Sequence, residues 1–219
     1  MMLPEIELRE MIIVRHGQAE HMVNGLTGGW TNSHLTELGR RQAELTGPAL
    51  ARLIGDRDFG FYASDQPRAA ETARIIAASL GAEPTLTPAL RELNNGEAAD
   101  LTQEQAARIA CPITEPLIEW RPYPGAENWR EMSERVVAFC EELVRPQAGR
   151  RQRRLLQVLV LHGGSANAAI TWWLGLGIGE KLISFELDPC SIGLFSENKW
   201  GERTVVRAND TAHLAGLSG

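Results

Sequence analysis

Two short apolar runs, each followed at once by a histidine, are the clearest pattern along the chain. The first covers residues 11–14 and continues into Arg15 and His16, and the second covers residues 157–161 and ends at His162. Short, almost wholly apolar runs are typical of buried parallel strands in α/β sheets, where ligands bind beyond the carboxyl ends of the strands. We therefore expect both histidines to lie at one rim of a sheet.

Between these runs, apolar residues recur at helical spacing in two segments. Thr36 is suited to cap the first helix, and Pro48 lies inside its pattern, where a proline bends a helix. An apolar run at residues 59–63 predicts another strand, and the helix after it has Arg68 in its first turn and ends at Gly81. Arg68 would then lie at the same rim as the histidines. The predicted inner faces are Leu38, Leu45, Ala49 and Leu53 in the first helix, and Ala69, Ala73, Ile76, Ala77 and Leu80 in the second.

Turn residues and periodicity assign the remaining segments. Residues 18–35 are rich in glycine and asparagine, which predicts a long functional loop. Residues 101–123 show little periodicity and several prolines, so we expect a cap or insertion at about residues 100–127. The other expected elements are an extended piece at 84–88, a loop at 91–97, helices at 103–109 and 129–143, a helix capped by Ser165, and strands at 182–187, 192–195 and 204–207.

Length and composition favour one globular α/β domain covering residues 1–219. No apolar run approaches the roughly 20 residues that span a bilayer. The net charge of −6 disfavours nucleic acid and anionic membranes as partners, and the basic run at residues 150–154 is expected to be a solvated loop. Three cysteines without CxxC spacing argue against disulfides and thiolate zinc sites, and residues 1–7 lack a signal-peptide pattern. We expect a soluble cytoplasmic protein, with a homodimer left open.

Five side chains could meet at the predicted rim: Arg15, His16, Arg68, His162 and, from a loop, Glu92. Two guanidiniums can clamp phosphate oxygens by paired hydrogen bonds, which makes a phosphate pocket that needs no metal. One imidazole could attack phosphorus while the other, if protonated, stabilises charge on the phosphate oxygens. Glu92 could protonate the leaving alkoxide and then activate water. A metal held by the histidines and Glu92 is disfavoured, because the arginines would repel a cation.

Four segments in this order resemble the histidine phosphatase superfamily, also called phosphoglycerate mutase-like. They are residues 14–18 (VRHGQ), 64–73 (SDQPRAAETA), 90–92 (LRE) and 160–163 (VLHG), and weaker similarities extend the resemblance over about residues 11–214. The resemblance implies a three-layer αβα sandwich around a mixed, mostly parallel sheet. It also implies that His16 becomes phosphorylated, that Arg15, Arg68 and His162 complete the phosphate pocket, and that Glu92 is the proton donor.

The activity that the resemblance implies is hydrolysis of a phosphomonoester on a small metabolite, without metal or cofactor. A phosphoglycerate mutase-type phosphoryl transfer is one alternative, although the mutases carry a longer insertion than the 70 residues from Glu92 to His162. A weakly active phospholigand-binding protein is another. Substrate contacts are expected from Arg15, Gly17, Gln18, Asn24, Gly28, Arg68 and Gly163.

Several positions keep two interpretations. Many members of the family have asparagine where this chain has Met22, so either Asn24 takes its place or the phosphate clamp lacks one donor. Glu97 is the reserve candidate for the acid. We expect structural roles for His21, His34 and His213, and either core packing or a substrate pocket for Trp120, Arg121, Tyr123 and Trp129.

Overall fold

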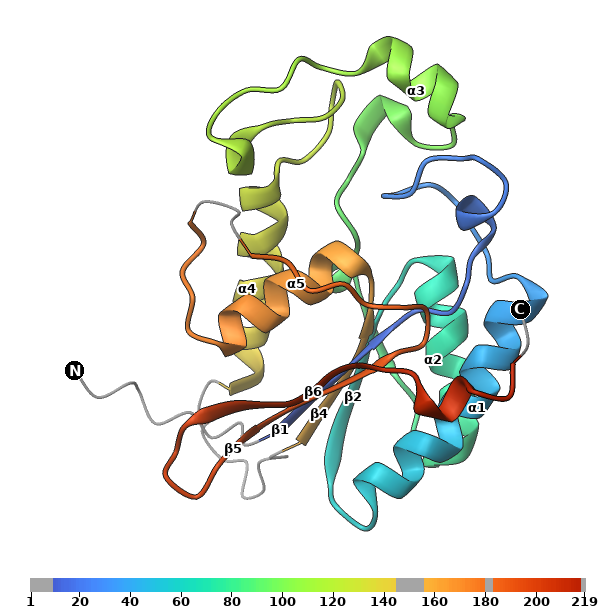
Figure 1. The fold of residues 1–219 in the computed structure, drawn as a ribbon, viewed down its shortest axis with the longest axis vertical. Helices are drawn as coiled ribbons and strands as arrows, with labels where there is room; N and C mark the ends of the chain where they lie inside the picture. Colours follow the sequence, from blue (N-terminus) through green and yellow to red (C-terminus); the bar gives the residue numbers. More distant parts are fainter. Residues whose placement is uncertain (1–9, 145–155, 180–182, 218–219) are drawn as a thin grey trace.

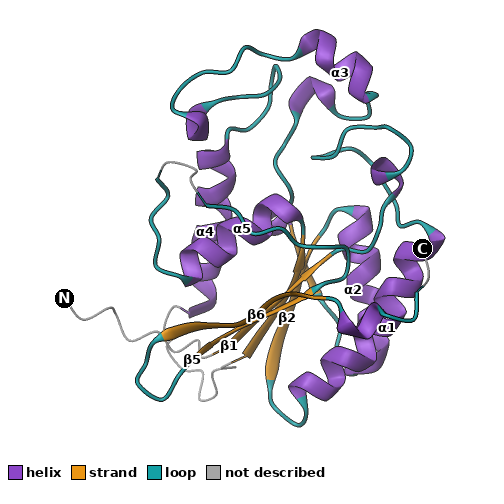
Figure 2. Cartoon of the chain, viewed as in Figure 1, coloured by secondary structure: helices purple, strands orange, loops and turns teal. Residues whose placement is uncertain are grey.

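The fold is a six-stranded mixed sheet between two layers of helices, seen in the computed structural model, which describes residues 10–144, 156–179 and 183–217 (Figures 1 and 2). The strand order is β3-β2-β4-β1-β5-β6. The first four strands are parallel, and β5 and then β6 join the sheet by antiparallel pairing. The strands are β1 (Glu10–Arg15), β2 (Phe59–Ser64), β3 (Thr85–Thr87), β4 (Leu156–Leu161), β5 (Ile192–Glu197) and β6 (Arg203–Asp210).

Helices cover both faces of the sheet, with α1 and α2 on one face and α4 and α5 on the other (Figure 1). The short helix α3 lies apart from both layers, beyond the end of the sheet. The α-helices are α1 (Glu37–Ile54), α2 (Pro67–Leu80), α3 (Gln103–Ile109), α4 (Trp129–Val144) and α5 (Gly163–Trp173), and the 3-10 helices are η1 (Glu20–Met22), η2 (Pro88–Leu90), η3 (Gly96–Ala98), η4 (Leu117–Glu119) and η5 (Ala212–Leu214). No helix of the described segments combines the length and the apolar character that a bilayer span requires.

Alternation along the central strands builds the two cores. Ile12 and Val14 of β1 pack in the cluster that includes α1 and α2, whereas Met11 and Ile13 pack in the cluster with α4 and α5. Successive side chains of a strand point to opposite faces, so a strand buried on both sides is apolar throughout. The predicted three-layer α/β fold is confirmed. Side chains of β1 and β4 pack into both cores, which holds the two strands in place.

The predicted inner face of α1 is wrong by one position. Leu45 is 39% exposed, and the buried side of α1 carries small residues such as Ala43 and Gly47. A Cβ at position 47 would lie 2.6 Å from Ser79 Oγ of α2, so the two helices approach closely at this point, and Leu50 takes the buried apolar position on this face. The apolar face of α2 is as predicted.

Two predictions after β4 also need correction. Helix α5 begins at Gly163 with His162 at its N-cap, and Ser165 instead accepts a hydrogen bond from the His162 N–H. The segment 183–187 is not a strand, because Asn167 of α5 holds Phe185 through both its amide and its carbonyl. Residue 182, the basic run at 150–154 and residues 1–7 lie outside the described residues.

A long connection between β3 and α4 carries α3 above the carboxyl ends of the parallel strands (Figure 1). The loop after β1 rises to meet it. Thr27 N–H donates to Leu101 O at 2.9 Å, and Gln103 N–H donates to Gly25 O at 2.9 Å. These backbone pairs join the two segments over the rim where the site lies.

Candidate functional site

Parallel pairing of β1 and β4 places the two histidines side by side. Arg15 lies opposite Leu161 in the register, and the His16 N–H continues the pairing by donating to Leu161 O at 2.9 Å. The imidazole rings of His16 and His162 are 5.0 Å apart, edge to face, and both side chains are buried. The sequence prediction that the two histidines share one rim is therefore confirmed.

His16 is held as a neutral imidazole that carries its proton on Nδ1 and a lone pair on Nε2. Its Nδ1 lies 2.7 Å from Gly17 O, and because a carbonyl only accepts, Nδ1 carries the proton. Its Nε2 accepts a hydrogen bond from Arg68 Nε at 3.2 Å. Burial first, and then the Arg68 and Arg15 charges, hold the pKa of His16 well below its ordinary value. The lone pair on Nε2 is thus available at neutral pH.

Arg68 is buried in the first turn of α2, and its position is fixed by carbonyls. Its guanidinium donates to Gly29 O at 2.7 Å and Thr31 O at 3.2 Å, in addition to His16. Burial lowers the pKa of Arg68 to about 10, which still leaves it charged at neutral pH. A fixed cation therefore faces the reactive nitrogen.

Arg15 supplies a second cation at the end of β1. It donates to Leu187 O, while its Nε is buried with no hydrogen-bond partner within the described chain. Burial lowers its pKa, and the negative charges of Glu92 and Asp188 act in the opposite direction. A buried donor without a partner is costly, so this nitrogen is suited to an anion that enters the site.

His162 also keeps one nitrogen for a ligand. Its Nε2 pairs with Ser64 Oγ at 2.9 Å, whereas its Nδ1 is buried without a partner among the described residues. Burial first, and then Arg68 and His16, hold the pKa of His162 well below its ordinary value. The expected protonated form therefore requires a bound anion, which would oppose the effect of Arg68.

Glu92 lies at the same rim, where its carboxylate contacts the first turn of α5. Gly164 N–H donates to Glu92 Oε2 at 2.9 Å, and Leu93 N–H donates to Oε1 at 2.9 Å. A Cβ at position 164 would lie 2.2 Å from Oε1, so only glycine allows this approach. The negative charge of Glu92 partly offsets the effect of burial, which lowers the pKa of both Arg15 and Arg68, as expected of a carboxylate near the two cations.

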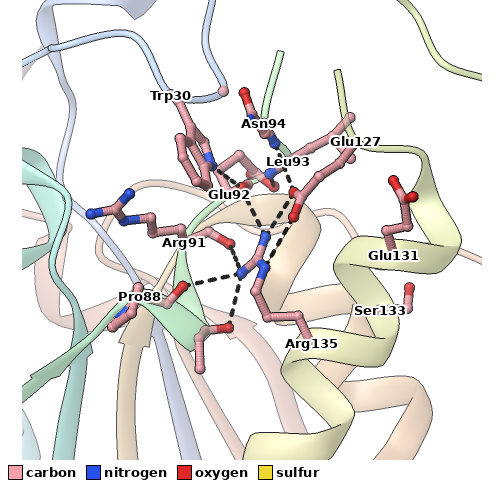
Figure 3. A network of polar contacts seen from close by, with 12 residues as sticks. Trp30, Pro88, Arg91, Glu92, Leu93, Asn94, Glu127, Glu131, Ser133 and Arg135 are labelled. Carbon is pink, nitrogen blue, oxygen red and sulfur yellow. Dashed lines mark hydrogen bonds and ion pairs between the residues drawn. The ribbon is translucent and has the colours of Figure 1, made fainter. Parts of the chain in front are cut away.

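The loop that carries Glu92 is held by Arg135 of α4, as Figure 3 shows. The Arg135 guanidinium donates to the carbonyls of Pro88, Ala89, Arg91 and Glu92 at 3.0–3.3 Å. Its Nη2 and Nε also pair with Glu127 at 2.8 and 3.1 Å, and Glu127 in turn accepts from Asn94 N–H. Sequence reasoning missed Arg135. The available signal was a charged residue beside Met132 and Val136 on the apolar side of a predicted helix.

Arg91 and Trp30 hold the other side of this loop. Arg91 makes two hydrogen bonds of 2.6 Å to Asp65 and lies 4.7 Å over the Trp30 ring. The Trp30 indole donates to Glu92 O at 2.8 Å, and Glu92 N–H donates to Gln66 Oε1 at 2.9 Å. The backbone of Glu92 is therefore fixed at both its donor and its acceptor.

Some of the other predicted contact residues lie beside the histidines, whereas others lie away from them. Gly17 and Gly163 lie beside the two histidines, and a Cβ at Gly17 would lie 2.5 Å from Gly39 O. Gln18 accepts from Thr36 Oγ1, and Gly28 lies in the loop near His21. Asn24 is exposed and binds Leu26 N–H, so the structure does not bring it to the cluster.

Met22, Glu97 and His21 also differ in their distance from the cluster. Met22 Sδ accepts from Ala19 N–H, and Glu97 is exposed. His21 lies 6.1 Å from the His16 ring and pairs with Ser33 Oγ at 2.9 Å. Burial, Arg68 and Arg15 lower the pKa of His21 to about 4, so a neutral third imidazole borders the site.

Comparisons with known proteins agree with this arrangement. The family model of the histidine phosphatase superfamily (branch 1) matches residues 11–211. A 2,3-bisphosphoglycerate-dependent phosphoglycerate mutase from Bartonella henselae is 32% identical over 90% of this chain and 98% of its own. A protein from Hydrogenobacter thermophilus, provisionally named phosphoserine phosphatase 2, is 28% identical over 96% of this chain and its whole length.

A solved structure gives the same answer. The mycobacterial glucosyl-3-phosphoglycerate phosphatase superposes with a TM-score of 0.73 at 25% identity, over 93% of this chain and all of its own. The matched region includes both strand-end histidines, Arg68 and Glu92. The chain belongs to the histidine phosphatase superfamily.

Proposed function

We propose that this protein hydrolyses phosphomonoesters of small metabolites through a phosphohistidine at His16. The observation that carries the proposal is the neutral His16 imidazole, whose Nε2 is buried beside the Arg68 cation with its proton fixed on the other nitrogen. A nucleophile that is already deprotonated needs no base. Arg15, Arg68 and His162 would hold the phosphate oxygens while Arg68 Nε leaves His16.

The reaction would proceed in two displacements. In the first, His16 Nε2 attacks phosphorus, the ester P–O bond breaks, and Glu92 gives its proton to the departing alkoxide. In the second, the Glu92 carboxylate takes a proton from water, the hydroxide attacks phosphorus, and the P–N bond breaks to release phosphate. Both steps concentrate charge on the equatorial oxygens, where fixed donors stabilise it most. Glu92 and His16 return to their starting forms.

No metal is required by this mechanism, because Arg15 and Arg68 supply the positive charge that a metal would otherwise bring. The connection from residue 88 to 128 would act as the cap over the leaving group. Its backbone pairing with the loop after β1 supports this role. Three free cysteines, two of them buried, fit the reducing cytoplasm that we propose as its compartment.

A mutase is the second candidate, favoured by the named mutases among the relatives. A mutase uses the same phosphohistidine but returns the phosphoryl group to a retained acceptor. Release of inorganic phosphate in equal amount to substrate consumed separates the two activities.

The test is hydrolysis of 4-nitrophenyl phosphate after exhaustive chelation, with His16→Ala beside the unmodified protein. We expect metal-free activity, an acid-labile phosphate on His16, and loss of turnover by several orders of magnitude in the variant. His34→Ala, at an exposed position outside the cluster, is the control and should keep full activity. Phosphate found on serine or cysteine, or activity restored only by a metal, would overturn the proposal.

A further inference from the structure

The space beside Glu92 indicates what the enzyme releases. A pocket of about 310 Å³ lies there, and its walls come from the loop after β1, the Glu92 loop and the connection that carries α3. The leaving group departs from the side of the acid, so this pocket is where it would lie. The inference that follows rests on the proposed function and adds the substrate class.

No cation lines this pocket among the described residues. Among the described residues that line it, Glu92 alone is ionisable at neutral pH, and the rest provide amides, hydroxyls, apolar side chains and glycine backbone. The loop at residues 17–35 contains neither lysine nor arginine. A carboxylate on the leaving group would therefore find no cation in this wall to pair with, and burying a charge without a partner is costly.

The cations of the surrounding connection are also engaged elsewhere. Residues 88–144 contain five arginines, no lysine and eleven acidic residues. Each of the five arginines forms an ion pair with a carboxylate, and the Arg135–Glu127 pair is drawn in Figure 3. The other pairs are Arg91–Asp65, Arg108–Glu104, Arg121–Glu131 and Arg130–Glu119. Freeing one of them for a substrate would leave its carboxylate unpaired.

The pocket instead offers groups that suit hydroxyls. Tyr123 and Trp129 contribute aromatic side chains, and Tyr123 also brings a hydroxyl group. Gln103 contributes an amide from the exposed first turn of α3, where it donates to Leu26 O. Apolar walls with a few polar groups are typical of sites for small molecules, and the polar groups here are uncharged donors and acceptors that suit hydroxyls.

We propose that the physiological substrate is the phosphate ester of an uncharged, hydroxyl-bearing alcohol such as a sugar or polyol, and that esters with a carboxylate beside the phosphate are disfavoured. The proposed substrate therefore differs from phosphoserine and phosphoglycerate, the compounds that appear in the names of two relatives.

A matched pair of esters tests the proposal. Glycerol 3-phosphate and 3-phosphoglycerate share a three-carbon skeleton and differ in a CH₂OH group against a carboxylate. We expect kcat/KM to be at least about ten-fold higher for the glycerol ester, because a carboxylate that loses water without gaining a cation is destabilised. Equal or inverted preference would overturn the inference.

Adding one cation to the pocket sharpens the test. Gln103→Lys should move the ratio of the two kcat/KM values toward 3-phosphoglycerate by several-fold, whereas Gln103→Met, of similar length and without charge, should not. A ratio that moves equally in both variants would overturn the charge argument. Hydrolysis of 4-nitrophenyl phosphate is measured in parallel, and its absence from the unmodified protein would overturn the proposed function itself rather than the substrate class.

Discussion

The two ends of the proposed site are held in place by different means. The phosphate end contains His16 and His162, and the acid end contains Glu92. His16 and His162 follow the central strands β1 and β4, whose side chains are buried on both faces of the sheet. Glu92 lies on a loop without regular structure, fixed by the Arg135 guanidinium and the Arg91–Asp65 pair. The phosphate end therefore depends on the hydrophobic core, and the acid end depends on side-chain hydrogen bonds.

This difference predicts how each end responds to change. A buried sheet resists local movement because its packing is shared among many residues. A loop held by a few side-chain hydrogen bonds shifts when Arg135 loses its fork of donors. Substitutions at the acid end should thus alter proton transfer while the phosphate is still bound and transferred.

The largest effect should come from Glu92→Gln, through the leaving group. An alkyl ester leaves as a basic alkoxide and needs a proton, whereas nitrophenolate does not. We expect phosphorylation of His16 in single-turnover bursts to slow by about 10²–10⁴-fold for an alkyl ester and far less for the nitrophenyl ester. Glu97→Gln, exposed on the same loop, is the control. Equal losses for the two esters would move Glu92 from acid to positioning residue.

A smaller effect of the same kind is expected from Arg135→Lys. Lysine keeps the charge but cannot contact four carbonyls and Glu127 at once, so Glu92 should lose its alignment. We expect the alkyl rate to fall about ten-fold with little change in the nitrophenyl rate. Arg130→Lys, on the same helix but paired with Glu119, should leave the ratio of the two rates unchanged. A parallel fall of both rates would mean that Arg135 serves stability alone.

The smallest effect concerns stability against pH at the phosphate end. The pKa of His16 and of His162 is lowered in the folded protein, so the unfolded chain binds more protons below about pH 6.5. The two neutral histidines therefore make their full contribution to the free energy of unfolding above about pH 6.5. This contribution is lost as the pH falls, by up to about 1.4 kcal/mol per pH unit for each histidine. Urea unfolding at pH 6.5 and 5.5 should show a smaller pH dependence in His16→Ala than in His34→Ala. Identical dependence in both variants would contradict the buried neutral state.

The sequence was sufficient for the phosphate end because its signals are local. An apolar run that stops at a histidine fixes both the strand and the side chain at its end, and Arg68 follows from the helix that begins there. The same reasoning failed on α1, where hydrophobicity selected leucines but close contact with α2 required Ala43 and Gly47. Packing distance between two helices leaves no mark in either sequence alone.

The acid end was predicted only in part, for a related reason. The family motif identified Glu92, but the groups that hold it come from elsewhere in the chain. Arg135 contacts carbonyls 43–47 residues earlier, and a carbonyl carries no side-chain identity that a sequence could show. The strand expected at residues 182–187 was also wrong over residues 183–187. There the side-chain amide of Asn167, and not a neighbouring strand, binds the backbone of Phe185.

The junction of β4 with α5 has no spare residue. Leu161 ends the strand, His162 is the N-cap of the helix, and two positions later the Gly164 N–H donates to Glu92. Each residue of an α-helix advances the chain by about 100° around the axis, so one inserted residue here would turn the acid's amide partner away while leaving the imidazole in place. Length variation should therefore be excluded from residues 161–164 but tolerated at residues 112–115, which are exposed. A library of single-residue insertions across the chain would show this as a narrow intolerant interval beside a permissive one.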